Sequence, residues 1–85
     1  MDIIITHAFA DYVRESRLDA GDTRETLAQR TGLDVYRIDR CEMNVGATMT
    51  LREMARLVSV LGTTSARARR VFGAMPELAG QPHFD

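Results

Sequence analysis

Apolar side chains recur at helical spacing along most of the chain, and short polar or glycine-containing stretches separate the segments. We predict five helices, covering Thr6 to about Ala20, 23–30, about 35–43, Thr50 to Gly62, and a last segment starting at Thr64 or Ser65. Their inward faces are, in order, Phe9, Tyr12, Val13, Ser16 and Ala20; Leu27 and Ala28; Ile38 and Cys41; Leu51, Met54, Ala55, Val58 and Leu61; and Ala68, Val71, Phe72 and Met75. The pattern predicts an all-α fold, a compact bundle of five short helices.

Residues that favour helix ends stand at the boundaries of these segments. Thr23 and Asp34 can accept hydrogen bonds from the first turns of the second and third helices. Gly32 lies between these helices and supplies a backbone angle that other residues resist. Thr50 and Glu53 form a capping box at the start of the fourth helix.

Two stretches lack the helical pattern. Residues 2–6, "DIIIT", are β-branched and predict a short strand or an extended arm, although Ile3–Ile5 could also be the irregular start of the first helix. Residues 43–49, "MNVGATM", are predicted to form a loop.

The length of 85 residues predicts a single domain over 1–85. We expect residues 6–62 to form its helical core and 63–75 an additional helix that Pro76 ends. Residues 76–85 are expected to form a loose tail.

Composition adds little that is specific. Apolar content is 45% and charge 27%, as in an ordinary globular domain, and the net charge of −1 gives no global basic field. All eleven basic residues are arginine, which either mirrors the coding bias of a GC-rich genome or serves forked contacts to phosphate and guanine.

The sequence shows no pattern typical of a disulfide, a metal site, an enzyme active site or a membrane segment. The single cysteine excludes an internal disulfide and a thiolate zinc site, and His7 and His83 lie far apart, so we expect no metal and no cofactor. No catalytic triad, phosphate loop or carboxylate pair is recognisable, and we expect a protein that is not an enzyme. No signal peptide or membrane span is recognisable, and a cytoplasmic protein is expected.

The third predicted helix carries the candidate binding chemistry. Ile38 and Cys41 point inward, whereas Tyr36 and Arg40 point the opposite way and could reach a partner. Arg24 and Arg37 lie beside the starts of two helices, where backbone N–H groups favour phosphate. Two short helices around a glycine turn, with such a bare outer face, are typical of readers of the DNA major groove.

The spacing Thr23, Leu27-Ala28, Gly32, Ile38 and Glu42 resembles the lambda-repressor-like helix-turn-helix family, the Cro and XRE regulators. The family pattern reads roughly Ser/Thr-x-x-x-Leu-Ala-x-x-x-Gly-Val-Ser-x-x-x-Ile-x-x-x-Glu, and the resemblance covers about residues 9–62. It implies a helix-turn-helix fold and binding to double-stranded DNA.

The resemblance also implies roles for individual residues. Base contacts would come from Val35, Tyr36 and Arg40. Phosphate contacts would come from Thr23, Arg24, Arg37 and Asn44. Arg17 and Glu42 would form a structural ion pair. Asp39 departs from a simple DNA-binding face because it adds negative charge there.

Two segments are candidates for a homodimer interface. The stripe Ala68, Val71, Phe72 and Met75 is either core or interface, and the strand edge at Ile3, Ile4 and Ile5 could pair with a second copy. The basic run Arg67, Arg69 and Arg70 is a solvated helix face, a phosphate contact or part of a partner surface.

The favoured hypothesis is a dimeric, sequence-specific transcriptional regulator, a repressor of its own or a neighbouring operon. The alternative hypothesis is an antitoxin-like or other protein-binding module in which DNA binding is secondary. The near-neutral charge, Asp39 and the isoleucine arm favour the alternative.

Overall fold

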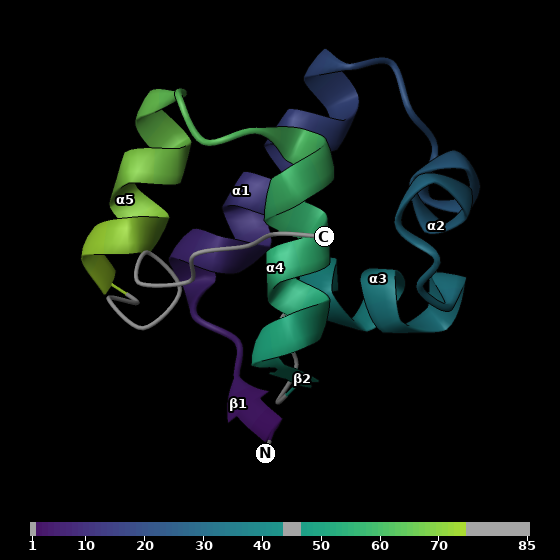
Figure 1. Ribbon diagram of the computed structural model, residues 1–85, viewed down its shortest axis with the longest axis horizontal. Coiled ribbons are helices and arrows are strands. Elements are labelled where there is room, and N and C mark those ends of the chain that lie inside the picture. The colour runs from purple at the N-terminus through teal and green to yellow at the C-terminus, as the bar shows by residue number, and fades with distance from the viewer. Residues whose placement is uncertain (1, 44–46, 75–85) are drawn as a thin grey trace.

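The chain forms five helices and two short strands in the part that the computed structural model describes, residues 2–43 and 47–74. The elements are β1 (Asp2–Ile4), α1 (His7–Asp19), α2 (Arg24–Thr31), α3 (Val35–Met43), β2 (Thr48–Thr50), α4 (Leu51–Leu61) and α5 (Ala66–Ala74). α1 and α4 occupy the middle of the molecule, with α5 on one side and α2 and α3 on the other (Figure 1). The prediction of a compact, mainly helical fold is confirmed, with a small sheet in addition.

α1 begins where the sequence predicts. The Thr6 hydroxyl accepts a hydrogen bond from Phe9 N at 3.1 Å, which caps the helix. The predicted inward face is buried except for Ala20, which is exposed because it follows the last helical residue. The Tyr12 hydroxyl donates to the Gly62 carbonyl at 2.6 Å, so α1 is tied to the end of α4. Burial raises the pKa of Tyr12, which keeps this donor protonated.

α2 and α3 are joined by a tight turn that requires glycine. Thr23 caps α2 in a reciprocal box with Thr26, and Gly32 ends the helix at φ 74°, in the left-handed region. A Cβ at Gly32 would also lie 3.3 Å from Nη1 of Arg56, which donates to the Thr31 carbonyl. Any other residue at this position therefore meets both backbone strain and crowding.

α4 opens with the predicted capping box. The Thr50 hydroxyl accepts from Glu53 N at 3.1 Å, and the Glu53 carboxylate accepts from Thr50 N at 2.9 Å. The predicted inward face omitted Leu57, which is fully buried. α4 packs against α1, α2 and β2, so it buries a wider arc than a single stripe.

A two-stranded antiparallel sheet replaces part of the predicted loop. β1 pairs with β2 in the register Asp2 to Thr50, Ile3 to Met49 and Ile4 to Thr48. The loop prediction is wrong for Thr48 and Met49, because Met49 is buried and its strand closes over the core. Residues 44–46 lie outside the described residues.

α5 packs against α1 and starts where Ser65 accepts a hydrogen bond from Ala68 N at 3.1 Å. Ala68 and Val71 are buried in the chain's own core, which agrees with the core alternative for this stripe. Ile5, a predicted interface residue, is buried there as well. Ile3 and Phe72 are half-buried, and Ile4 is 72% exposed. Met75, the Pro76 stop and the predicted tail 76–85 lie outside the described residues.

None of the described helices has the length and apolar character needed to cross a membrane. The longest, α1, has 13 residues, whereas about 20 apolar residues are needed to span a bilayer.

Candidate functional site

α3 has one face anchored in the core and one face bare. Ile38 and Cys41 are completely buried. The outer face of α3 consists of Val35 (38% exposed), Tyr36 (61%), Met43 (58%) and the exposed Arg40. The three residues predicted to contact bases therefore all lie on this outer face.

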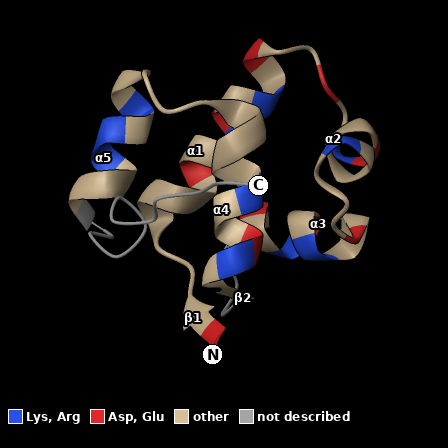
Figure 2. Cartoon of the chain, viewed as in Figure 1, with Lys and Arg blue, Asp and Glu red and all other residues tan. Residues whose placement is uncertain are grey.

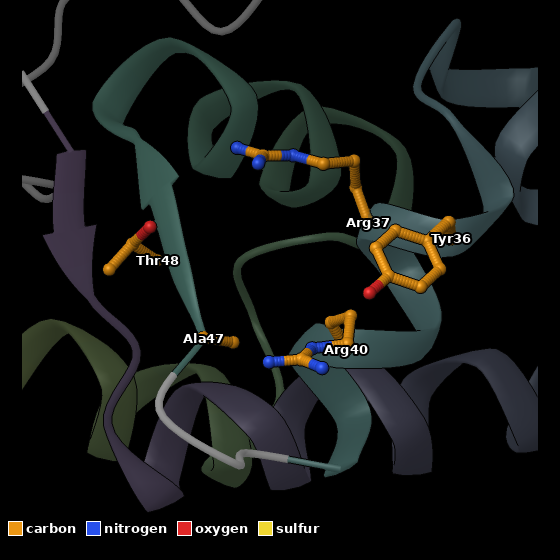
Figure 3. Close-up of a pocket in the computed structure, with 5 residues that line it drawn as sticks. All are labelled: Tyr36, Arg37, Arg40, Ala47 and Thr48. Carbon is orange, nitrogen blue, oxygen red and sulfur yellow. The ribbon is translucent and has the colours of Figure 1, made fainter.

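Tyr36 and Arg40 lie one helical turn apart and contact each other. The guanidinium carbon of Arg40 is 5.9 Å from the centre of the Tyr36 ring, within the range of a cation–π interaction. A surface pocket of about 190 Å³ adjoins them. Figure 3 shows Tyr36, Arg37 and Arg40 projecting from α3 on one side of this pocket, with Ala47 and Thr48 on the other. The side of the pocket formed by α3 is thus basic and aromatic.

The ion pair implied between α1 and α3 is present. Arg17 donates from Nε to Glu42 Oε2 at 2.7 Å and from Nη2 to Oε1 at 3.0 Å. The Glu42 side chain is 1% exposed and that of Arg17 is 11% exposed, and the hydrogen bond to Glu42 raises the pKa of Arg17. Two parallel hydrogen bonds in a nearly dry site fix the angle of α3 relative to α1.

Arg24 is engaged by carboxylates of α3. Its Nη1 lies 2.9 Å from Asp39 Oδ1, and its Nε donates to Glu42 Oε1 at 3.2 Å. The side chain remains 39% exposed, so solvent still reaches the guanidinium. Arg24 lies close to the outer face of α3, but it does not present all its donors outward.

Arg37 is engaged in the same way by α4. Its Nη2 and Nε bind the two oxygens of Glu53 at 2.6 and 3.2 Å. This hydrogen-bonded pairing raises the pKa of Arg37. Burial acts to raise the pKa of Glu53, but hydrogen bonds from Arg37 and Thr50 outweigh it, and the pKa is lowered. Both groups therefore stay charged over the physiological range.

The remaining candidate residues are Thr23, Asn44 and the basic run on α5. The Thr23 hydroxyl accepts from Thr26 N as the cap of α2 and remains on the surface. Asn44 lies outside the described residues. The basic run on α5 lies on the opposite side of the molecule from α2 and α3 (Figure 2), and its Arg67 pairs with Glu15 and Asp19.

The described part of the chain holds neither a reactive thiol nor a cluster of metal ligands. Burial raises the pKa of the Cys41 thiol to about 12, so it is protonated and inert. Over residues 2–43 and 47–74, no three His, Cys, Asp or Glu side chains lie close enough together to hold a metal ion.

The sequence did not reveal the acidic partners or the far wall of the pocket. The sequence indicates Asp39 only as a negative charge on the outer face of α3 and Glu53 only as a capping residue. Ala47 and Thr48 fell in a predicted loop. The alternation of apolar Ala47, polar Thr48 and apolar Met49 is a signal that could have placed this wall on a strand.

Comparisons with known proteins give no relative from which to transfer a function: no protein-family model, no curated protein and no solved structure matches the chain.

Proposed function

We propose that the protein is a sequence-specific DNA-binding transcriptional regulator that reads double-stranded DNA through α3. The observation that carries this proposal is the division of α3 into a fully buried face and an outer face whose side chains are of types able to contact bases. In the proposal, α2, the Gly32 turn and α3 act as a lambda-repressor-like helix-turn-helix, with α3 as the recognition helix.

The geometry suits insertion into a groove. The major groove of B-DNA is about 12 Å wide and accepts one α-helix. The Arg17–Glu42 pair supports α3 from behind, which keeps its direction fixed while the outer face docks. A fixed α3 would bring Arg40 to the same depth in the groove each time the protein binds.

The side chains on the outer face of α3 are of types that can contact base edges. An arginine can donate two parallel hydrogen bonds to the O6 and N7 acceptors of guanine. Val35 and Tyr36 offer apolar surface to thymine methyl groups. Arg24 and Arg37 lie beside this face and could contact phosphates once they exchange a carboxylate partner for a phosphate oxygen.

We further propose that two copies bind together as a repressor of their own or a neighbouring operon. Two recognition helices about 34 Å apart would meet successive major grooves on one side of a duplex. Among the predicted interface residues that the structure describes, the exposed Ile4 on β1 and the half-buried Ile3 and Phe72 are available for contact between copies. In this proposal the protein acts by binding and catalyses no reaction.

One observation favours a second function, a protein-binding module of the antitoxin type. Val35, Tyr36 and Met43 put three large apolar side chains on one helix face, which also suits a protein partner. DNA binding would then be secondary, and the same face would be buried by the partner.

Selection of the full chain against a random duplex library tests the first function. We expect enrichment of one sequence, with an inverted repeat as the signature of the dimer. Arg40→Ala should lose about 1–3 kcal/mol of discrimination between the selected duplex and a scrambled one. Arg69→Ala, an exposed arginine of α5 on the opposite side, is the matched control and should keep it. Lack of enrichment, or unchanged discrimination in Arg40→Ala, contradicts the proposal.

A further inference from the structure

Two guanidiniums and two carboxylates form a connected charge cluster where α1, α2 and α3 meet. The cluster consists of Arg17, Arg24, Asp39 and Glu42. Its formal charge is zero, since two positive and two negative groups balance. The Arg17–Glu42 pair lies behind the outer face of α3, and the Arg24–Asp39 pair lies beside it.

The two carboxylates of the cluster, Glu42 and Asp39, differ in the arginines that they bind. Glu42 is 1% exposed, and both its oxygens accept hydrogen bonds from Arg17. Its additional bond from Arg24 is longer, at 3.2 Å. Asp39, whose Oδ1 lies 2.9 Å from Nη1 of Arg24, is therefore the carboxylate partner that Arg24 does not share with Arg17.

The Arg24–Asp39 pair is accessible and hence exchangeable. The two side chains are 39% and 37% exposed, and pairs at such positions are only weakly favourable. A phosphate oxygen is chemically equivalent to a carboxylate oxygen as a partner for guanidinium. A duplex that approaches α3 would meet Arg24 with one partner already in place.

We propose that Asp39 competes with DNA phosphate for Arg24 and thereby lowers the overall affinity for duplex DNA. This inference rests on the proposed function. Phosphate contacts are blind to sequence, so a competing carboxylate weakens binding to every duplex alike. Base contacts made by Arg40 are untouched by this competition. Asp39 thus lowers the affinity for all duplexes together and leaves the preference among them unchanged.

The Arg37–Glu53 pair resembles this arrangement but does not carry the same inference. Glu53 also closes the capping box of α4 by accepting from Thr50 N. Its pairing with Arg37 therefore already has a structural role. Asp39 is not a capping residue, and the bond from Arg24 to Glu42 does not involve Asp39.

The test compares Asp39→Asn with Glu25→Gln on a short mixed-sequence duplex. Glu25 is exposed, adjoins Arg24 in the first turn of α2 and loses the same single charge. Asp39→Asn should tighten binding about three- to tenfold at low salt. Its slope of log affinity against log salt should steepen by about 0.9, the value for one more phosphate. Glu25→Gln should give a smaller gain and an unchanged slope.

A double-variant cycle identifies the route of the effect. In an Arg24→Ala background, Asp39→Asn should give no more gain than Glu25→Gln, because the competed group is gone. Equal effects of Asp39→Asn and Glu25→Gln, or a gain that persists without Arg24, would overturn the inference. Loss of preference for the selected duplex in Asp39→Asn would also overturn it, since Asp39 would then be reading a base itself.

The outcomes separate the two proposals. If the wild-type chain prefers a selected duplex and Asp39→Asn behaves as Glu25→Gln does, the inference fails and the proposed function stands. If no sequence is preferred but Asp39→Asn tightens binding through Arg24, sequence-specific recognition fails and the competition stands. Absence of duplex binding by every variant overturns both.

Discussion

α3 and α5 are helices of nine residues each, both carry arginines, and both pack one side against α1. Their solvent sides differ. α3 exposes Val35, Tyr36 and Met43 beside Arg40, whereas the exposed residues of α5 include Arg69 and Arg70 and no large apolar side chain among those described.

The difference teaches which kind of basic helix face is a candidate for recognition. Arginines alone on a helix are often only a solvated face, and Arg67 on α5 is held by two acids of α1. Large apolar groups left in water beside an arginine have no such ordinary explanation when they cluster. The basic run on α5 is therefore the weaker candidate, although it contains more arginines.

The largest expected effect concerns the anchor of α3. Glu42→Ala should lower the free energy of unfolding by about 3–5 kcal/mol, because Arg17 would remain nearly buried with no charge partner. Urea denaturation followed by circular dichroism measures it. Arg70→Ala on the solvent side of α5 is the control and should change stability by less than about 0.5 kcal/mol. A loss below about 1 kcal/mol for Glu42→Ala would mean that α3 is held by apolar packing alone.

An intermediate effect concerns the buried side of α5. Val71→Ala should cost about 2 kcal/mol of stability, since Val71 is 1% exposed and its methyl groups leave a cavity against the core. Affinity for the selected duplex should not change while the variant is folded, because α5 lies across the molecule from α3. Weakened binding by a folded Val71→Ala protein would make α5 part of the recognition surface and remove the contrast between the two helices.

The smallest effect concerns the lateral support of α3 by α4. Glu53→Gln keeps a capping group but loses the charge that Arg37 binds, so it should cost about 1 kcal/mol or less at neutral pH. The pKa of Glu53 is lowered in the folded chain, so its contribution is present above the unfolded value of about 4.3 and is lost as pH falls through the folded value. The stability difference between wild type and Glu53→Gln should therefore shrink in acid. A difference independent of pH would show that the ion pair contributes nothing.

Helix positions could be predicted from the sequence because their signals are local. Thr6, Thr23 and Thr50 each cap a helix within three residues of themselves, and Gly32 ends one by its own backbone freedom. The strand β2 could not be predicted in this way. It has three residues, and its stability comes from pairing with β1 more than forty positions earlier, a contact that no local pattern encodes.

The same distinction between local signals and long-range contacts applies to the side chains of the site. The exposure of Tyr36 and Arg40 follows from helical periodicity alone. The partners of Arg24 and Arg37 do not, because several acids lie within reach of each long side chain and packing decides among them. Arg30, for example, pairs with Asp22, a choice that spacing along the chain does not dictate.

The pairing of β1 with β2 has a practical consequence for handling the protein. Asp2 lies opposite Thr50 and Ile4 lies opposite Thr48, a residue that lines the pocket beside Arg40. An affinity tag or fluorophore attached ahead of Asp2 would thus emerge next to the surface under study and could obstruct it. Labels for titrations belong instead on the remote flank, for instance at a cysteine introduced in place of Arg69, while the native thiol at position 41 stays shielded.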